Sequence, residues 1–309
     1  MTNRTGPRVT PQFSLELPTQ HVDHAAELVT GDAIAEVARA AEAAGFAAVH
    51  VTDHPAPDTK WLDSGGHHAL DPFVALAFAA AATTELRLLT NIYVAAYRNP
   101  FLGAKSIHSL DVLSGGRLIV GTAAGYLKPE FAALGADFDN RGARLDEALD
   151  VMARLFTGED VARDGEGYSA RGVRFRPRGV ARPHPPVWIG GNSKPAIRRA
   201  VARWQGWSPF MTAGYAKGSR TAEIDGVEDV RAAIGWAREH AAEIGRTEPL
   251  DVCFSAGTMI DPSRSVDERQ AVLAALVDAG VTWFTVAVPG TTRAEVIANA
   301  EAFARDLLS

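Results

Sequence analysis

Short runs of β-branched and aliphatic residues alternate with helical patterns along almost the whole chain, and each of eight such runs is followed by a predicted helix. This alternation is typical of a parallel sheet covered by helices, and eight repeats predict an α/β fold of the closed (β/α)8 TIM-barrel type. The predicted strands are Phe13–Leu17, Ala47–His54, Leu86–Val94, Arg117–Gly125, Val187–Gly191, Gly206–Phe210, Leu250–Gly257 and Val281–Val288.

Start and stop signals mark the predicted helices. The helix over Gly31–Gly45 ends in glycine, and Asp71 and Pro72 open the next helix as its cap and first-turn proline. Later helices are predicted over 100–116, 140–156, 193–204, 227–244, 271–279 and 291–308.

An open doubly wound sheet is the competing architecture. That fold normally has a glycine-rich turn after its first strand, whereas the stretch "FSLELPTQHVDH" that begins at Phe13 contains no glycine. No change of composition marks a linker, so we expect one domain over residues 1–309. We expect the irregular segment 157–186 to be an insertion before the fifth strand that partly covers the site.

Composition narrows the class of protein. A net charge of −6 disfavours nucleic acid as a partner, because phosphate binding needs a positive face. The apolar run Phe73–Ala82 is short, since a membrane span needs roughly 20 residues. Cys253 is the one cysteine, and the first residues lack the apolar core of a signal peptide. We therefore expect a cytoplasmic protein with a small-molecule substrate and no membrane or nucleic-acid partner.

Polar residues follow the second predicted strand, which ends in "TDH", Thr52 to His54. In a barrel of this type the active site forms at the carboxyl ends of the strands. His54 is either a proton donor or ring partner in such a site, or a cap on the turn before Pro55. Asp53 either orients His54 or caps the same turn. The residues alone leave both interpretations open.

Three further strand ends carry candidate residues. Asn91 lies within an apolar strand, and its amide must find partners either in the core or in a site. The stretch "GTAAGY" from Gly121 to Tyr126 has small residues that suit either a flat ring or tight barrel packing. The stretch "GGNS", Gly190–Ser193, opens a helix and is either an ordinary turn or a phosphate-binding turn.

Other motifs give no support to hydrolytic or metal chemistry. His67 and His68 are adjacent, so they cannot both face one metal from a regular strand, and we predict no metal site. The chain has no G-x-S-x-G nucleophile elbow. The arginine-rich run from Arg171 to Arg182 is interpreted as a solvated hairpin or partner surface rather than an anion site.

Several segments together resemble the bacterial luciferase-like superfamily of flavin and deazaflavin oxidoreductases, and most closely its branch that depends on coenzyme F420. The segments are "GFAAVHVTDH", "LRLLTNIYV", "LSGGRLIVGTAAGY", "RGARLDEALDVMARLFTG" and "PPVWIGGNSKPAIRRA", within residues 13–210. The resemblance implies a TIM barrel, a homodimer, and F420 or FMN bound without a covalent link.

The resemblance also implies particular site residues. His54 matches the histidine that faces the deazaflavin ring, and Asn91 and Ile92 match a pair joined by a non-prolyl cis peptide bond behind the ring. The turn that ends in Ser193 matches the phosphate turn. The implied cofactor contacts are Asp53, His54, Asn91, Ile92, Ala124, Gly125, Gly190, Gly191, Asn192 and Ser193.

One position departs from the family pattern. Some F420-dependent dehydrogenases of this family have a catalytic glutamate directly after the glycine that ends the fourth strand, where this chain has Tyr126. A tyrosine ordinarily has a pKa near 10, so it is a weak replacement for a carboxyl group. The departure disfavours sugar-phosphate dehydrogenation and leaves hydride transfer open, because the cofactor carries that chemistry.

These observations combine into a prediction of an F420-dependent oxidoreductase that transfers a hydride between the deazaflavin and an organic substrate. His54 and Tyr126 are the predicted catalytic residues, which polarise or protonate the reacting groups. An FMN-dependent monooxygenase that uses reduced flavin and oxygen is the nearest alternative. A non-catalytic flavin- or deazaflavin-binding protein with a blocked pocket is an alternative of another class.

Overall fold

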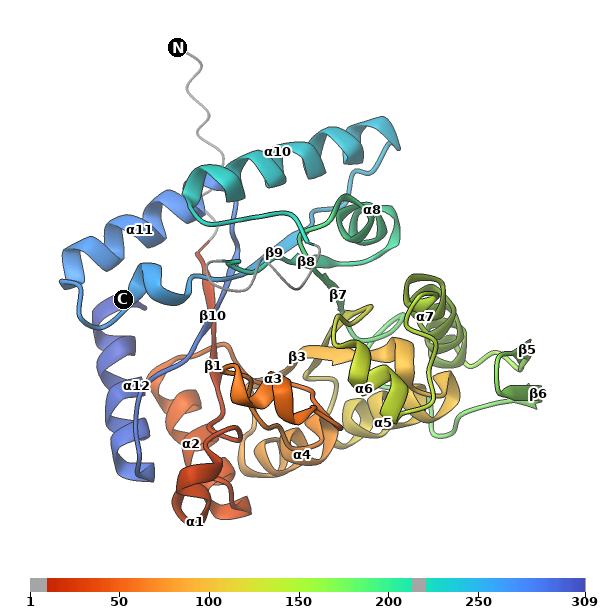
Figure 1. Ribbon diagram of the computed structural model, residues 1–309, viewed down its shortest axis with the longest axis horizontal. Coiled ribbons are helices and arrows are strands. Elements are labelled where there is room, and N and C mark those ends of the chain that lie inside the picture. Colours follow the sequence, from red (N-terminus) through yellow and green to blue (C-terminus); the bar gives the residue numbers. More distant parts are fainter. Residues whose placement is uncertain (1–9, 213–220, 309) are drawn as a thin grey trace.

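Residues 10–212 and 221–308, the part of the chain that the computed structural model describes, form a closed barrel of eight parallel strands surrounded by helices (Figure 1). The strand order around the barrel is β1-β10-β9-β8-β7-β4-β3-β2. The predicted TIM barrel and its eight strands are confirmed. The barrel strands are β1 (Gln12–Glu16), β2 (Ala48–Val51), β3 (Arg87–Val94), β4 (Leu118–Ala123), β7 (Val187–Gly190), β8 (Gly206–Ser208), β9 (Asp251–Ser255) and β10 (Trp283–Val286).

The outer layer consists of long helices, with shorter elements in the loops between strands and helices. The long helices are α2 (Gly31–Ala44), α4 (Pro72–Ala82), α5 (Pro100–Leu113), α7 (Arg141–Thr157), α8 (Lys194–Arg203), α10 (Val227–Glu243), α11 (Val266–Ala279) and α12 (Arg293–Leu307). The shorter elements are η1 (Val22–His24), α1 (Ala25–Leu28), α3 (Thr59–Asp63), η2 (Ala95–Tyr97), α6 (Lys128–Ala133) and η3 (Gly257–Ile260).

Capping side chains define where these helices begin. The carboxylate of Asp71 accepts hydrogen bonds from two backbone N–H groups in the first turn of α4, as its place before a proline predicts. Helix α11 begins at Val266 rather than near Ala271. The reason is a capping box, in which Ser265 and Glu268 each bond the other's backbone N–H group.

The barrel interior is a packed core rather than a pore. Ala48, Leu89, Ile119, Trp188, Cys253 and Trp283 form a buried cluster inside it. The neighbouring strands β3 and β4 approach so closely that a Cβ atom at Gly121 would lie 2.2 Å from the carbonyl oxygen of Thr90. Gly121 is therefore explained by tight packing, one of the two interpretations of the "GTAAGY" stretch. As in other barrels of this type, a site is expected at the carboxyl ends of the strands.

The segment before the fifth barrel strand is an inserted antiparallel hairpin, β5 (Val161–Gly165) and β6 (Tyr168–Val173). Tyr168 packs edge-on against Phe101 of α5, and Arg163 pairs with Asp150 of α7 at 2.8 Å. Figure 1 shows the hairpin at the edge of the molecule, beyond α7. The insertion is confirmed, but the expectation that it covers the site is wrong, because it packs on the outside of the helical layer.

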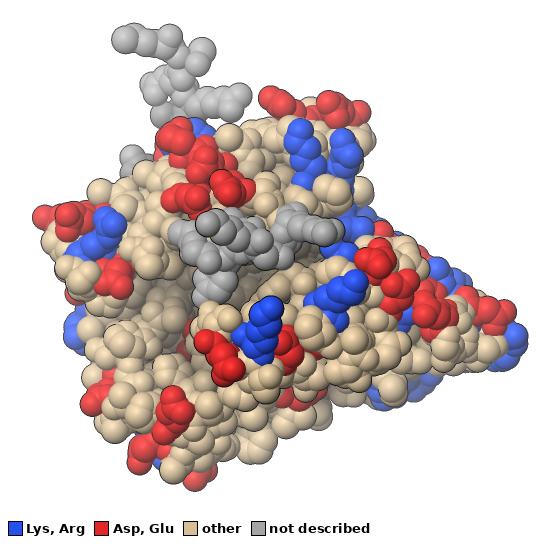
Figure 2. All heavy atoms as spheres, in the orientation of Figure 1, with Lys and Arg blue, Asp and Glu red and all other residues tan. Residues whose placement is uncertain are grey.

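Charged side chains of both signs share the surface. In and beside the inserted hairpin, Arg171 pairs with Asp164 and Arg174 pairs with Asp160, and all four side chains are exposed. The arginines of the run are exposed, but only Arg171 lies in the hairpin and the others follow it, so the solvated position is confirmed and a partner surface stays a prediction. Figure 2 shows acidic and basic residues interspersed over the viewed face. Among the helices of the described residues, none is long and apolar enough to cross a membrane.

Candidate functional site

A buried ion pair fixes the loop that follows β2. Both carboxylate oxygens of Asp53 accept hydrogen bonds from the guanidinium of Arg98, at 2.6 and 2.8 Å, and one also accepts the backbone N–H of Val94 at 2.9 Å. Asp53 is only 3% exposed. Burial raises the pKa of Asp53, and the charge of Arg98 opposes that shift. Asp53 thus ties the end of β2 to the end of β3, which places His54 next to β3.

The imidazole of His54 is held by a second buried carboxylate. Its Nδ1 atom lies 3.4 Å from Oε2 of Glu130 on α6, whose other oxygen accepts the backbone N–H of Ala56 at 3.1 Å. Glu130 is 2% exposed. In this contact the carboxylate accepts and Nδ1 of His54 donates, so the contact leaves Nε2 for another partner.

Aromatic rings surround His54 on its other sides. The ring centroids of Trp61 and His67 lie 4.4 and 5.0 Å from that of His54, and the ring of Tyr126 lies 6.1 Å away and edge-on. Burial lowers the pKa of His67, which favours its neutral form. In the described part of the chain no group of three His, Cys, Asp or Glu residues is placed to hold a metal ion. His67 instead forms part of the aromatic wall around His54.

The predicted cis peptide bond between Asn91 and Ile92 on β3 is present. The side chain of Ile92 extends toward β7, so that a Cβ atom at Gly190 would lie 2.8 Å from Cδ1 of Ile92 and 3.4 Å from Cβ of Ala123. Asn91, Ile92 and Gly190 therefore meet at the carboxyl ends of their strands, as the sequence predicts. Glycine at position 190 is explained by this close approach.

Side chains of neighbouring elements pack closely against the backbone that follows β4. Gly125 has a φ angle of +82°, and a Cβ atom there would lie 2.7 Å from Val94 and 2.8 Å from Phe131. Its carbonyl oxygen accepts a hydrogen bond from Arg141 at 3.1 Å. The next residue, Tyr126, is 48% exposed, and Ala124 before it is partly buried. Contacts with Val94, Phe131 and Arg141 thus fix the backbone at Gly125, one of the predicted cofactor contacts.

The side chain of Asn192 in the turn after β7 is occupied by structural hydrogen bonds. Its amide group donates to the carbonyl oxygens of Phe210 and Ala222, at 2.8 and 3.1 Å, and accepts from the N–H of Phe210 at 3.0 Å. Ser193 caps α8, and Gly191 has a φ angle of +113°. The backbone N–H groups of Gly191 and Asn192 donate to Ser208 and Thr221, so an anion would meet the amino end of α8 rather than the Asn192 amide. The phosphate turn stays a prediction.

A further carboxyl group lies at the end of β1. Glu16 is paired in register with His50 of β2, and Ser14 bonds Nδ1 of His50 at 3.0 Å inside the barrel. Burial raises the pKa of Glu16 to about 7, and a hydrogen bond with Gln20 opposes part of this shift. Burial lowers the pKa of His50 to about 3, so its ring is neutral at pH 7. Glu16 therefore titrates near neutral pH beside a neutral imidazole.

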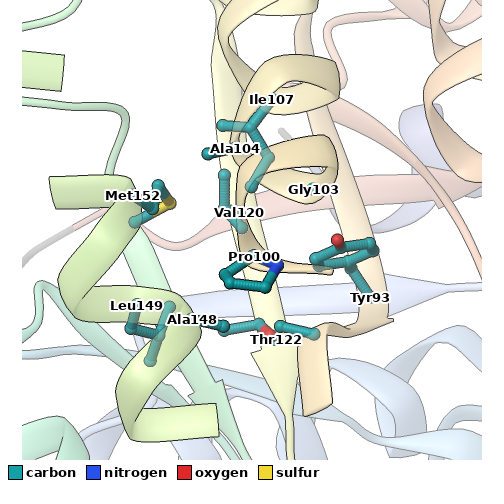
Figure 3. Close-up of a pocket in the computed structure, with 11 residues that line it drawn as sticks. Tyr93, Pro100, Gly103, Ala104, Ile107, Val120, Thr122, Ala148, Leu149 and Met152 are labelled. Carbon is teal, nitrogen blue, oxygen red and sulfur yellow. The ribbon is translucent and has the colours of Figure 1, made fainter. Parts of the chain in front are cut away.

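Two cavities lie away from these strand ends. One of about 10 Å³ lies between the strands β3 and β4 and the helices α5 and α7; Figure 3 shows Tyr93, Thr122 and Met152 around it. This volume has room for about one water molecule. A second, of about 550 Å³, is lined by residues such as Trp204 and Arg246 near the amino ends of β7 and β9. Neither cavity is lined by a predicted site residue.

Sequence reasoning missed four residues of this region: Glu16, Trp61, Arg98 and Glu130. Each lies at the end of a barrel strand or in the loop that follows it. Such positions are where a barrel places its functional side chains. Charged and aromatic residues in these loops were the signal that could have identified them.

The chain is similar in sequence to known proteins. The sequence profile of the family described as luciferase-like monooxygenase matches residues 12–306. An FMNH2-dependent dimethylsulfone monooxygenase of Pseudomonas putida is 30% identical over 168 residues, 53% of this chain and 44% of that protein. An uncharacterized protein of Mycobacterium tuberculosis is 30% identical over 229 residues, 70% of this chain and 74% of that protein.

Solved structures share the same barrel. A monooxygenase from Streptomyces bottropensis superposes with a TM-score of 0.79 at 22% identity, covering 96% of this chain and 98% of that one. The coenzyme F420-dependent tetrahydromethanopterin reductase of Methanopyrus kandleri superposes with a TM-score of 0.72 at 18% identity and the same coverage. The family profile extends over almost the whole barrel, from β1 to α12. This chain belongs to the luciferase-like monooxygenase family.

Proposed function

We propose that the protein is an F420-dependent oxidoreductase that transfers a hydride between the deazaflavin and an organic substrate. The observation that carries the proposal is His54, which Glu130 holds at the end of β2 through Nδ1, so that Nε2 is left for a bound ring. The cis bond between Asn91 and Ile92 lies at the end of the next strand. At the carboxyl end of the barrel, His54 provides a polar edge and the residues of the cis bond form a close-packed wall.

The residues at these strand ends fit a flat tricyclic ring. Ala123, Ala124 and Gly190 have small or no side chains, so a ring can approach the backbone of β4 and β7. Asn91 and Ile92 would lie behind the ring, and the amino end of α8 at Ser193 would face an anionic tail. These residues would hold the cofactor, which supplies the hydride chemistry when it is bound.

The chain's own residues have separate tasks in this arrangement. Glu130 orients the imidazole of His54, and the ion pair of Asp53 with Arg98 fixes the loop that carries it. His54 would hydrogen-bond the polar edge of the ring through Nε2. Tyr126, at the exposed rim, would contact the substrate with its hydroxyl group.

An FMN-dependent monooxygenase is the second candidate, because the matching relative from Pseudomonas putida is FMNH2-dependent. A competition experiment separates the two. Apoprotein is mixed with equal concentrations of F420 and FMN, passed through a desalting column and denatured, and the released cofactor is identified by mass spectrometry. We expect F420 in excess. Retention of FMN in excess would move the assignment to the monooxygenase, and retention of neither would exclude both.

A Glu130→Gln variant is expected to slow hydride transfer about tenfold and leave the affinity for F420 within about twofold. The reason is that the charged hydrogen bond to Nδ1 of His54 becomes a neutral one, which loses about 1–2 kcal/mol. Single-turnover kinetics and a binding titration measure the two quantities. Glu301→Gln on the exposed side of α12 is the control. Equal rates for Glu130→Gln and wild type would show that Glu130 does not orient His54.

We also propose that the protein is a homodimer that pairs through α4 and α5. Val74 and Phe78 on α4 and Leu102 and Leu113 on α5 are exposed apolar side chains, with Leu113 at 77%. Such a patch on a helical surface indicates an interface. Light scattering is expected to give twice the chain mass of 32.9 kDa for wild type and a monomer for Leu102→Glu. A monomeric wild type at micromolar concentration would contradict the proposal.

A further inference from the structure

We propose that Glu16 is the proton-transfer group of this site, and that the substrate is an uncharged molecule whose carbonyl or hydroxyl oxygen lies against the Glu16 carboxyl. The inference rests on the proposed function and deepens it. Some family members have a catalytic glutamate after β4, where this chain has Tyr126. Glu16 at the end of β1 would supply the acid–base group that is missing there.

The strand geometry places Glu16 on the inner side of the barrel. Side chains alternate along a strand, so residues two apart face the same side. Ser14 faces inward, because its hydroxyl group meets the buried Nδ1 of His50. Glu16 follows on the same side, at the carboxyl end of β1 and beside His50 in the register. The residue keeps part of its surface exposed while protein encloses most of its carboxyl group, so a small molecule at the barrel mouth can reach it from one side.

Among the residues that the structure describes, no cation contributes to the shift of the Glu16 pKa. His50 on β2 is buried and neutral, and the neighbouring residues Thr285 and Val286 of β10 are uncharged. In the segment after β1, the side chain of Gln20 hydrogen-bonds Glu16. His21 lies directly before η1 and Asp23 lies within it. In the described part of the chain the shift of the Glu16 pKa has two causes, burial and the Gln20 hydrogen bond. The carboxyl therefore exchanges its proton in the neutral range.

The chemistry balances with reduced deazaflavin as the two-electron donor. In the reducing direction the substrate carbonyl carbon accepts a hydride, and the π electron pair moves to the carbonyl oxygen. Glu16 gives that oxygen its carboxyl proton, which yields an alcohol and leaves a carboxylate. The carboxylate regains a proton from water. In the opposite direction Glu16 accepts the hydroxyl proton as the hydride leaves. An anionic group at this place would be repelled by the carboxylate, which is why the substrate is uncharged there.

The first test measures the titration of Glu16 without any ligand. The unfolding free energies of wild type and Glu16→Gln are compared between pH 4 and pH 8 by urea denaturation. A raised carboxyl pKa in the folded state means that the folded protein binds more protons, so the stability it contributes is lost as the pH rises from 4.5 to about 7. We expect wild type to lose stability relative to Glu16→Gln across this window, with no further change above it.

The matched control is Glu301→Gln, an exposed glutamate of α12. Its difference from wild type is expected to stay constant over the same range. A difference between wild type and Glu16→Gln that does not change with pH would overturn the assignment of Glu16 as a group that titrates near neutrality.

The second test measures the role of Glu16 toward the substrate. Wild type and Glu16→Gln are loaded with reduced F420 and mixed with a panel of simple aldehydes and ketones. We expect wild type to oxidise the coenzyme with at least one of them, and Glu16→Gln to do so about 100-fold more slowly with a flattened pH profile. The affinity for F420 should change less than about twofold, since Glu16 acts on the substrate.

Each result of this second test has one meaning. Equal rates in both proteins, or no reaction of wild type with any carbonyl compound, would overturn the inference. Failure of wild type to bind F420 at all would instead overturn the proposed function. The unfolding experiment would in that case still report whether Glu16 titrates near neutral pH, so the two failures are distinguishable.

Discussion

An Arg98→Met variant is expected to lose about 3–5 kcal/mol of unfolding free energy, because it leaves the carboxylate of Asp53 buried without its cation. The guanidinium of Arg98 makes two short hydrogen bonds to Asp53, which is 3% exposed. Methionine keeps the apolar length of the side chain and removes the charge. Urea denaturation at pH 7 measures the loss.

A matched control for this variant is available on the surface. Arg231→Met removes an arginine that pairs with Asp278 at 2.9 Å between two exposed side chains. Exposed pairs contribute about 0–1 kcal/mol, so we expect a small loss. An Arg98→Met protein as stable as Arg231→Met would show that the ion pair does not hold the loop of His54. Adding Asp53→Asn to Arg98→Met is expected to recover part of the loss, because the buried charge is then gone.

A His54→Gln variant is expected to slow hydride transfer by about 10²–10³-fold, since a preorganised hydrogen bond to the reacting ring contributes a factor of this size. Glutamine can still bond Glu130, so the loop should keep its place. The measurement is the single-turnover rate with reduced F420 and a carbonyl acceptor that wild type accepts. Far-ultraviolet circular dichroism and unfolding show whether the variant is folded.

The control for His54 is a second histidine that contacts a carboxylate. His240 of α10 lies 3.1 Å from Glu243, which is exposed. His240→Gln is expected to leave the rate and the cofactor affinity unchanged. If His54→Gln behaved as His240→Gln does, His54 would have no part in the reaction.

The fold could be predicted from the sequence because its signals are local. Strand runs, proline and aspartate at the start of α4, and glycine at Gly45 act within a few residues of where they stand. The start of α11 was placed too late, although Ser265 and Glu268 carried a capping signal. The inserted hairpin was located correctly along the chain, but its position outside α7 depends on tertiary contacts such as Tyr168 with Phe101.

The site was predictable only in part, because its partners are far apart in the sequence. His54 was a candidate from its place at the end of a strand and gained support from the family resemblance, whereas the cis bond after Asn91 came from the resemblance alone and is confirmed. The partner of His54 is Glu130, 76 residues later, and the pairing follows from α6 packing against the loop after β2. No local pattern encodes such a contact.

Polar residues that look like ligands can have structural tasks. The side chain of Asn192 stands in a predicted phosphate turn, yet its amide joins that turn to Phe210 and Ala222. Asp53 has a similar task through Arg98. Composition and spacing give the chemical type of a side chain, whereas its hydrogen-bond partners come from the folded chain.

The proposed function requires the barrel mouth beside His54 to hold a deazaflavin. A titration of apoprotein with oxidised F420, and separately with FMN, followed by quenching of protein fluorescence, tests it most directly. We expect a dissociation constant on the order of micromolar for F420 and at least about tenfold weaker binding of FMN. Tighter binding of FMN, or no binding of F420 to folded protein, would contradict it.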